Sequence, residues 1–526
     1  MIKEISISLP AKEALSEQSV KQFVTQELGL GPDSLFTVQV VKRSIDARNR
    51  NIKMNLKLRV VVGESLTEEK IEIEYKQVNT KQLVYIVGAG PAGLFAALKC
   101  IELGIKPIII ERGKKVRDRR RDLATINKAH VVNPESNYCF GEGGAGTYSD
   151  GKLYTRSGKR GSIDKVLKTL IYHGAHADII VDAHPHIGTN KLPGIIENMR
   201  NTILQYGGEI WFETKLVDVL HKNNAITSIT VQSENEGSRE LETTNLILAS
   251  GHSARDIYTL LHDKKIYVEA KPFAMGVRVE HPQEIIDSIQ YHCASKNEWN
   301  EKREFLPAAS YSLVHQVNGR GVYSFCMCPG GIIAPCATSQ EEVVTNGWSP
   351  SKRNNPFANS GIVVELKLTD FKSNGKHDPF SALRFQKELE RNAWIYGGKT
   401  QTAPAQRLLD FINNRESKNL PDCSYQPGIV SVGMDKVLGP LLANSLRGGF
   451  KGFGQKMRNY LSNDAIIVGV ESRTSTPVRI PRDAETLEHI EIKGLYPCGE
   501  GAGYAGGIVS AAIDGERCAE MACDKF

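Results

Sequence analysis

The chain has 526 residues, and at roughly 150 residues per domain this length predicts about two to four domains and excludes a small peptide. Hydrophobic residues make up 40% and charged residues 24% of the chain, a balance that excludes global disorder. The formal net charge of +6 is small for this length, so it indicates an anionic small ligand more readily than nucleic acid.

The start of the chain and its cysteines indicate the compartment. Residues 1–10 include a Glu and no long apolar run, and no stretch approaches the roughly 20 apolar residues of a membrane span. The 10 cysteines show neither a Cys-x-x-Cys motif nor a regular spacing, which is typical of reduced thiols. We therefore expect a cytoplasmic protein without an anchor or a signal peptide.

Residues 1–80 predict a small N-terminal α+β module. A strand-like start with Ile5 and Ile7 precedes a helical stretch around residues 13–28, and residues 55–62 alternate as a strand. Polar residues 77–82 then separate this module from the β-branched run Leu83–Val87. The sequence has no internal repeat, so a solenoid is excluded.

The strand Leu83–Val87 leads into the first motif that carries chemistry. Gly88-Ala-Gly-Pro-Ala-Gly93 lies between that strand and a helical pattern, and a second strand, Pro107–Ile110, ends at Glu111. In such a motif the first glycine permits the tight turn, the second lets backbone approach a pyrophosphate, and the third allows close helix packing. The acidic residue accepts hydrogen bonds from a ribose diol. This pattern predicts a dinucleotide-binding fold.

Two later strands also end in glycine. They are Leu246–Gly251 and the stretch Gly494–Ile508, and a single-domain NAD enzyme does not need either of them. With these strands the chain resembles the two-dinucleotide-binding-domain flavoproteins of the glutathione reductase superfamily. The resemblance implies FAD as the cofactor, with Glu500 binding the ribityl chain and the following helix pointing its N-terminus at the flavin.

Further strings are similar to one family of uncharacterised FAD-dependent dehydrogenases, sometimes labelled NAD(FAD)-utilising dehydrogenases. The matching strings are Gly143–Lys152, Pro185–Thr189, Gly251–Arg255, Cys326–Gly331, Ala358–Gly361 and Glu471–Pro477. A more distant likeness, confined mainly to the FAD-binding segments, is to the flavoprotein that modifies the wobble uridine of tRNA.

The resemblance implies an α/β fold class with a discontinuous Rossmann-like FAD-binding domain. Residues 81–261 and 463–526 are expected to form this domain, and a β-meander is expected within residues 209–231. Residues 262–462 are expected to form an inserted α+β cap, with the substrate pocket between the two domains. The predicted FAD contacts are Gly88, Gly90, Pro91, Ala92, Gly93, Glu111, Arg112, Gly143, Gly144, Ala145, Gly146, Thr147, Leu216, Ser250, Gly251, Gly499, Glu500, Gly506, Gly507 and Ile508.

The sequence lacks two features of the disulfide-reductase branch. Neither Gly452-Phe-Gly454 nor Gly319-Arg-Gly321 completes a second dinucleotide motif, so a dedicated NAD(P) domain is not expected. Because there is no Cys-x-x-Cys, a flavin–dithiol relay is not expected either, and Cys139 is interpreted as a buried thiol. The three cysteines Cys326, Cys328 and Cys336 lack a fourth iron–sulfur ligand, which favours packing in strands and turns.

Four residues are candidates for catalysis. Lys152 follows a glycine-rich loop and could polarise the flavin, and His186 could transfer a proton beside it. Arg278 could face a pocket and hold an anion, and Arg473 lies shortly before the final FAD strand, near where the flavin is expected. The alternative for the histidine is a hydrogen bond to a loop, and for each arginine an ion pair within the fold.

Clusters of histidine and of basic residues suggest other ligands. His173, His176 and His184 lie near His186 with two aspartates between them, but no zinc spacing matches, so no metal is expected. The basic run at residues 112–121 could receive phosphates or could begin a solvated helix. Residues 42–59 are also basic, yet few aromatics lie among the charges, so nucleic acid is not an expected partner.

We therefore expect an FAD-dependent oxidoreductase, a dehydrogenase that exchanges a hydride between a small-molecule substrate and flavin N5. NAD(P)H could serve as a transient reductant. The alternatives are a tRNA-modifying flavoprotein, a noncatalytic FAD-bound scaffold or sensor, and a monooxygenase. The substrate, the direction of the reaction and the oligomeric state stay open.

Overall fold

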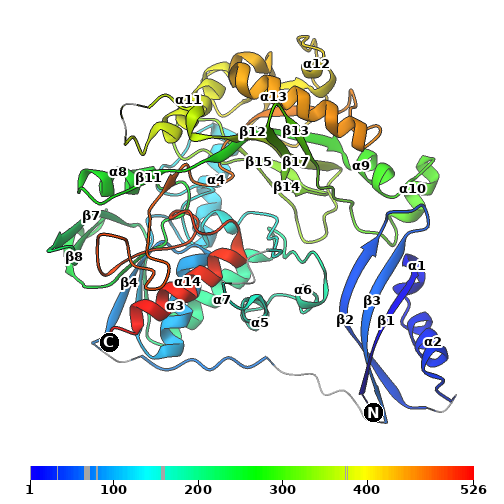
Figure 1. Ribbon diagram of the computed structural model, residues 1–526, viewed down its shortest axis with the longest axis horizontal. Helices are drawn as coiled ribbons and strands as arrows, with labels where there is room; N and C mark the ends of the chain where they lie inside the picture. The colour runs from blue at the N-terminus through cyan, green and yellow to red at the C-terminus, as the bar shows by residue number, and fades with distance from the viewer. Residues whose placement is uncertain are drawn as a thin grey trace.

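Figure 1 shows the computed structural model, in which an N-terminal module lies beside a lower α/β domain and an upper cap. The structure describes residues 2–31, 34–63, 71–78, 81–155, 160–373, 375 and 377–526. No described helix is both long enough and apolar enough to cross a membrane.

The N-terminal module is a three-stranded antiparallel sheet with a helix on one face. Its elements are β1 (Ile2–Pro10), α1 (Ala11–Ala14), α2 (Glu17–Leu28), β2 (Phe36–Asp46) and β3 (Lys53–Val62), and the strand order is β1-β3-β2. Ser16 caps α2 by accepting from the Ser19 N–H, and Gly29 ends the helix in the left-handed region. Alternate β3 side chains pack against Val20 and Val24 of α2, which confirms the expected α+β module.

A five-stranded parallel sheet forms the centre of the lower domain. Its order is β22 (Leu495–Pro497), β10 (Leu246–Leu248), β4 (Leu83–Val87), β5 (Lys106–Ile110) and β6 (Glu209–Trp211). These short strands are almost wholly apolar because both of their faces are covered. The edge strand β22 comes from the end of the chain, so the Rossmann-like domain is discontinuous, as the sequence predicts.

Helices cover one face of this sheet and strands cover the other. The helical side is formed by α3 (Pro91–Leu103), α5 (Ile163–Tyr172), α7 (Leu192–Gln205) and α14 (Ile508–Cys523). The opposite side carries α8 (Arg255–Asp263) and the meander β7 (Thr214–Lys222), β8 (Ala225–Ser233) and β9 (Gly237–Glu242). The meander begins later than predicted, because residues 209–211 pair with β5 instead. Two further helices are α4 (Val116–Ala129) and the one-turn α6 (Asp178–Val181).

The cap is built on a seven-stranded sheet. In spatial order its strands are β13 (Val314–Val317), β14 (Arg320–Cys328), β17 (Phe357–Leu366), β12 (Phe273–Pro282), β20 (Ile466–Glu471), β18 (Ala403–Arg407) and β19 (Ile429–Ser431). The long helix α13 (Met434–Lys456) packs on the face away from the lower domain (Figure 1). Because β20 pairs with both β12 and β18, this sheet continues past the predicted boundary at residue 462.

Smaller elements complete the cap and its junction. They are α9 (Gln283–Gln290), α10 (Lys296–Lys302), α11 (Ser381–Tyr396), α12 (Leu408–Ile412), and the strand pairs β11 (Glu269–Ala270) with β21 (Val478–Arg479) and β15 (Ile332–Pro335) with β16 (Thr345–Trp348). Two short 3-10 turns lie at Gly144–Gly146 and Leu368–Asp370.

The contact between α3 and α14 depends on a glycine. The two helices lie side by side in Figure 1, and a Cβ atom at Gly515 would lie 2.0 Å from the Ala92 carbonyl oxygen. No side chain fits at that distance. The last helix can therefore approach the first only with glycine at this position.

We predict that Gly515→Ala lowers the free energy of unfolding by about 1–3 kcal/mol, because the new methyl group must push the two helices apart. Urea unfolding checks this. The matched control is Gly194→Ala in α7, where a Cβ meets nothing within 4 Å and alanine is the better helix former. Equal stability of the two variants would contradict the close approach.

Candidate functional site

A cavity of about 390 Å³ opens at the carboxyl edge of the parallel sheet. The strands β4, β5, β10 and β22 all end there, since parallel strands bring their carboxyl ends to one edge. Cap residues Phe325, Cys326 and Asn346 form part of the wall. The cavity thus lies between the lower domain and the cap, and its volume is typical of a small-ligand site.

The first glycine-rich loop has the geometry that the motif predicts. Gly88 has φ of 105°, and a Cβ there would lie 2.4 Å from the Ala249 carbonyl oxygen. A Cβ at Gly93 would lie 1.9 Å from the Gly88 carbonyl oxygen, so this glycine lets α3 pack on β4 and lies behind the cavity. Gly90 caps α3 and lines the cavity together with Pro91 and Ala92. The positive end of the helix therefore faces the cavity.

Glu111 joins three loops through one buried carboxylate. Its Oε2 accepts from the Ala89 N–H at 2.8 Å, and its Oε1 accepts from the Gly113 and Gly141 N–H groups at 2.9 Å each. The side chain is 5% exposed and lines the cavity. A carboxylate has about four acceptor sites, so one remains for a ribose hydroxyl. The predicted ligand contact is compatible with this second, structural role.

The second glycine-rich loop is held from behind by a buried arginine. Gly144, Ala145 and Gly146 line the cavity, whereas Gly143 and Thr147 face the interior. Arg119 of α4 is fully buried and donates to the carbonyls of Asn137, Glu142 and Gly144 and to Thr147 Oγ1. The basic run at residues 112–121 is therefore not simply a solvated helix start, because one of its arginines fixes this loop.

Other predicted FAD contacts gather at the rim. Leu216, Ser250 and Gly251 line the cavity, and the buried Ser250 Oγ has no hydrogen-bond partner. Arg112 also lines it, but its guanidinium pairs with Glu135 and Asp256 and stacks on the ring of Phe140. This arginine therefore has fewer donors available for a phosphate than the sequence suggests.

The C-terminal segment closes the cavity on the helix α14 side. Glu500, Gly506, Gly507 and Ile508 line it, whereas Gly499 does not. The Gly506 N–H donates to Ser510 Oγ at 3.0 Å, and the Gly507 N–H donates to the Glu500 carboxylate. These two N–H groups are expected to face the flavin but have partners within the chain. A bound flavin must therefore replace these contacts or share them.

The four catalytic candidates separate into two pairs. Lys152 and Arg473 line the cavity, and His186 and Arg278 do not. His186 bonds the Ser351 carbonyl oxygen through Nε2, and burial lowers its pKa. Arg278 is fully buried and pairs with Glu471 at 2.7 Å, so the alternative of an internal ion pair is confirmed for this residue and the anion clamp is wrong.

Arg473 belongs to a network of four charges at the junction with the cap, in which Arg473, Glu342 and Glu390 are buried and Arg255 is partly buried. It pairs with Glu342 at 2.8 Å and with Glu390 at 3.1 Å, and Arg255 of α8 bonds the same two carboxylates. Burial acts to raise the pKa of Glu390, but the charges of Arg255 and Arg473 lower it to about 2. The two arginines keep Glu390 ionised, and the ion pairs fix Arg473 at the cavity wall.

The cavity also contains residues that the sequence analysis did not select. His252 lines it with Nδ1 at 2.8 Å from Ser253 Oγ and Nε2 at 3.8 Å from Glu500, and burial lowers its pKa despite that carboxylate. Cys326 lines it too, contrary to the expected role in strand packing. Both residues lie in strings that are similar to the dehydrogenase family, so the sequence offered a signal that could have found them. Nothing in the sequence singled out Asn346.

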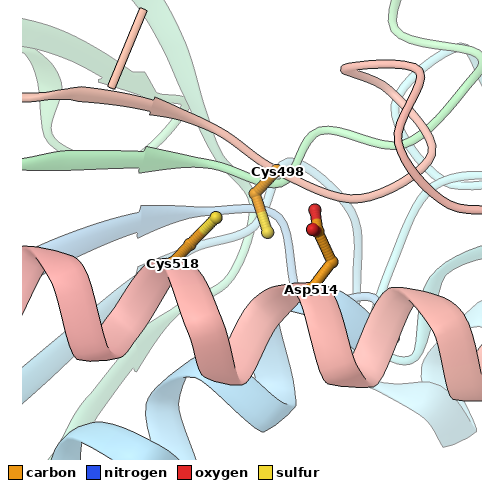
Figure 2. Close-up of side chains that lie close together, drawn as sticks. All are labelled: Cys498, Asp514 and Cys518. Atoms are coloured by element: carbon orange, nitrogen blue, oxygen red, sulfur yellow. The ribbon is translucent and has the colours of Figure 1, made fainter. Parts of the chain in front are cut away.

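One group of possible metal ligands lies beside the cavity. Figure 2 shows Asp514 and Cys518 of α14 pointing toward Cys498, and among the residues that the structure describes these three form the only such group. Arg482 occupies this group, since it donates to both Asp514 oxygens and lies 3.3 Å from Cys518 Sγ. The Arg482 guanidinium already balances the charge of the Asp514 carboxylate, so these residues form an internal ion pair.

The clustered histidines and the basic N-terminal residues have partners in the fold. His173 bonds the Thr169 carbonyl oxygen and Thr202 Oγ1, and Arg43 pairs with both Asp178 and Asp182. Four other cations of the N-terminal module, Arg48, Arg50, Lys57 and Arg59, also pair with carboxylates. These residues therefore form ion pairs and hydrogen bonds within the fold.

The residues present fit FAD. The unpartnered Ser250 Oγ, the helix N-terminus at Gly90 and the remaining acceptor site on Glu111 all lie along one cavity. Hydroxyl, pyrophosphate and ribose groups need these partners. Sixteen of the 20 predicted contacts line the cavity, and Gly93, Gly143, Thr147 and Gly499 support it from behind.

We predict that Glu111→Gln weakens FAD binding by at least about tenfold, because the amide must point a donor at an N–H group of one of the three loops. Fluorescence titration of the flavin-free protein with FAD measures this. Glu236→Gln, an exposed carboxylate between β8 and β9, is the control and is expected to bind FAD normally. Unchanged binding by Glu111→Gln would contradict the role of this carboxylate.

The Glu390 carboxylate predicts a pH dependence of stability. Its pKa is about 2 in the folded chain and 4.5 in the unfolded chain. Its contribution to the free energy of unfolding is therefore fully present above pH 4.5 and is lost as the pH falls toward 2. Glu390→Gln should cost about 3–5 kcal/mol at neutral pH and should lose less stability on acidification. Urea unfolding at about pH 6 and about pH 3.5 checks this. Glu341→Gln, an exposed neighbour, is the control; parallel pH profiles for Glu390→Gln and the unchanged protein would contradict the prediction.

Comparisons with known proteins agree with this geometry. Residues 81–260 match the family described as FAD binding domain, residues 272–474 match the FAD-dependent protein, C-terminal domain-like family, and residues 1–61 match a domain of unknown function. An uncharacterized protein of Clostridium beijerinckii is 38% identical over 545 residues, covering 100% of this chain and 98% of that protein.

Solved structures give only weak likenesses. A flavoprotein/dehydrogenase from Cytophaga hutchinsonii is 10% identical, with 84% of this chain and 78% of that one covered and a TM-score of 0.35. A geranylgeranyl bacteriochlorophyll reductase-like protein from Thermoplasma acidophilum is 13% identical, with 84% and 77% covered and the same score. At these scores the likenesses carry no argument about this chain. The family matches do: this chain belongs to the family of the Clostridium beijerinckii protein, and it contains an FAD-binding domain followed by a domain like the C-terminal domain of an FAD-dependent protein family.

Proposed function

We propose that this flavoprotein is a dehydrogenase, in which a small molecule held between the cap and the FAD-binding domain exchanges a hydride with the flavin. One observation carries the proposal. A single cavity is lined both by the glycine-rich loops of the lower domain and by Phe325, Cys326 and Asn346 of the cap. The flavin, when bound, supplies the redox chemistry, and the chain supplies the binding and orientation.

Two cations at the cavity wall suit a substrate with a negative or polarised oxygen. Lys152 lies 3.8 Å from Asp150, and although burial acts to lower its pKa, the neighbouring thiols and Asp150 raise it, so the ammonium stays charged. Arg473 is held by its two glutamates. Positive groups that are already fixed in place stabilise negative charge as it develops in the substrate, because the groups do not have to reorganise first.

His252 is the proposed proton-transfer group. It lines the cavity, and burial keeps its imidazole neutral near pH 7, the form that can accept a proton. Glu500 lies near its other nitrogen and favours the imidazolium once it forms. This arrangement suits the removal of a proton from a hydroxyl or amine beside the carbon that loses a hydride.

The direct test is an anaerobic titration of the FAD-loaded protein with NADPH, NADH and small alcohols, amines or hydroxy acids while the visible flavin absorption is followed. We expect one of these donors to bleach the flavin without oxygen. Bleaching by dithionite alone would contradict the proposal and favour a scaffold. A substrate that is hydroxylated only with oxygen uptake would favour a monooxygenase.

We predict that Arg473→Lys retains FAD but slows reduction by that donor at least about tenfold, because lysine cannot reproduce the paired hydrogen bonds that hold the guanidinium at the wall. Stopped-flow absorbance measures the rate. Arg391→Lys, an exposed arginine paired with Glu341, is the control and should reduce at the normal rate. A normal rate for Arg473→Lys would remove this arginine from the site.

A further inference from the structure

Two thiols at the end of β14 share one ammonium group. Lys152 Nζ lies 3.8 Å from Cys326 Sγ and 3.9 Å from Cys328 Sγ, and it also donates to the Met327 carbonyl oxygen. Cys326 lines the cavity, whereas Cys328 is buried directly behind it. A lysine that reaches across from the second glycine-rich loop thus contacts both sulfur atoms.

The backbone at this point departs from a regular strand. Cys326 has φ of 48°, in the left-handed region that a residue with a side chain seldom adopts, and the register between β14 and β17 shifts between Phe325 and Cys328. Such bulges re-aim side chains, and here the irregular residue is the one on the cavity wall.

Every charged or titratable group around Cys326 has a defined partner. Arg278 lies beneath it, donates to its carbonyl oxygen at 3.0 Å and pairs with Glu471. Asp150 lies between Lys152 and Arg353 and pairs with the latter at 2.8 Å. The hydrogen bond with Cys328 and the charges of Lys152 and Arg278 hold the pKa of Cys326 well below its usual range, while the same bond and burial raise that of Cys328.

We propose that Cys326 and Cys328 form a reactive dithiol site that takes a small-molecule disulfide from the cavity. The Cys326 thiolate attacks one sulfur of the disulfide, so that a mixed disulfide forms and one thiolate leaves. Cys328 gives its proton to the departing thiolate and attacks Cys326 Sγ, which breaks the mixed disulfide and releases the second half of the substrate as a thiolate. The disulfide has gained two electrons and the chain has lost them, which balances the step.

The spacing allows this bond. Both sulfur atoms lie within 3.9 Å of the same Lys152 Nζ, so the irregular backbone at Cys326 brings the two thiols toward one point. Cys326 is the attacking thiol because it is the one that opens on the cavity. The inference does not rest on the dehydrogenase proposal, since its test follows the thiols and not turnover.

The test treats the FAD-loaded protein with dithiodipyridine and identifies each modified cysteine by peptide mass spectrometry. We expect a Cys326–Cys328 disulfide without retained pyridine. In Cys328→Ser we expect Cys326 to keep one thiopyridyl group. Cys293→Ser, which removes another partly exposed thiol, is the control and should still form the Cys326–Cys328 bond. A stable pyridyl adduct on Cys326 of the unchanged protein would overturn the proposal.

A second measurement separates reactivity from folding. Lys152→Met should slow alkylation of Cys326 by iodoacetamide at neutral pH by at least about tenfold and shift the midpoint of its pH profile upward, because the thiolate loses its counter-ion. Lys152→Arg should restore much of the rate. Equal rates for Cys326 in the unchanged protein and in Lys152→Met, or a rate no faster than that of Cys293, would contradict the site.

Discussion

A network of four charges where the cap meets the FAD-binding domain, three of them buried, is the interaction on which the site depends. Arg255 and Arg473 each bond both Glu342 and Glu390. Burying so many charges is costly unless every one is paired, and losing one partner leaves an uncompensated charge. The two domains therefore meet in one arrangement. Because Arg473 also lines the cavity, the same contacts set the shape of the wall that faces the ligand.

The lower domain supplies the other wall through parallel strands that end together. Glu111 accepts from three loops at once, and Arg119 holds the second glycine-rich loop from behind. Loops that would otherwise move are thereby fixed before any ligand arrives, which reduces the entropy lost on binding. Lys152 follows this loop, and its side chain contacts Cys326 and Cys328 of the cap strand β14. One side chain thus connects the cofactor side of the cavity with the two thiols.

The sequence predicted most of the fold and much of the cofactor site, but little of the catalytic side. Gly88, Gly93 and Glu111 could be assigned because a local strand–turn–helix pattern fixes their roles. Arg278 and Cys326 could not be placed in this way, because their surroundings depend on contacts distant in sequence. Cys326 lies near Lys152, 174 residues earlier in the chain, and Arg278 pairs with Glu471. The start of the meander was misplaced because residues 209–211 look like any short strand, and only pairing with β5 assigns them to the parallel sheet.

A crystal structure of the FAD-loaded protein is the most direct test of a substrate site shared by the cap and the FAD-binding domain. We expect the pyrophosphate between Gly90 and the loop Gly144–Gly146, with the flavin ring facing Phe325, Cys326 and Asn346 of the cap. A ring turned away from these cap residues, or FAD bound outside this cavity, would contradict a substrate site shared by the two domains.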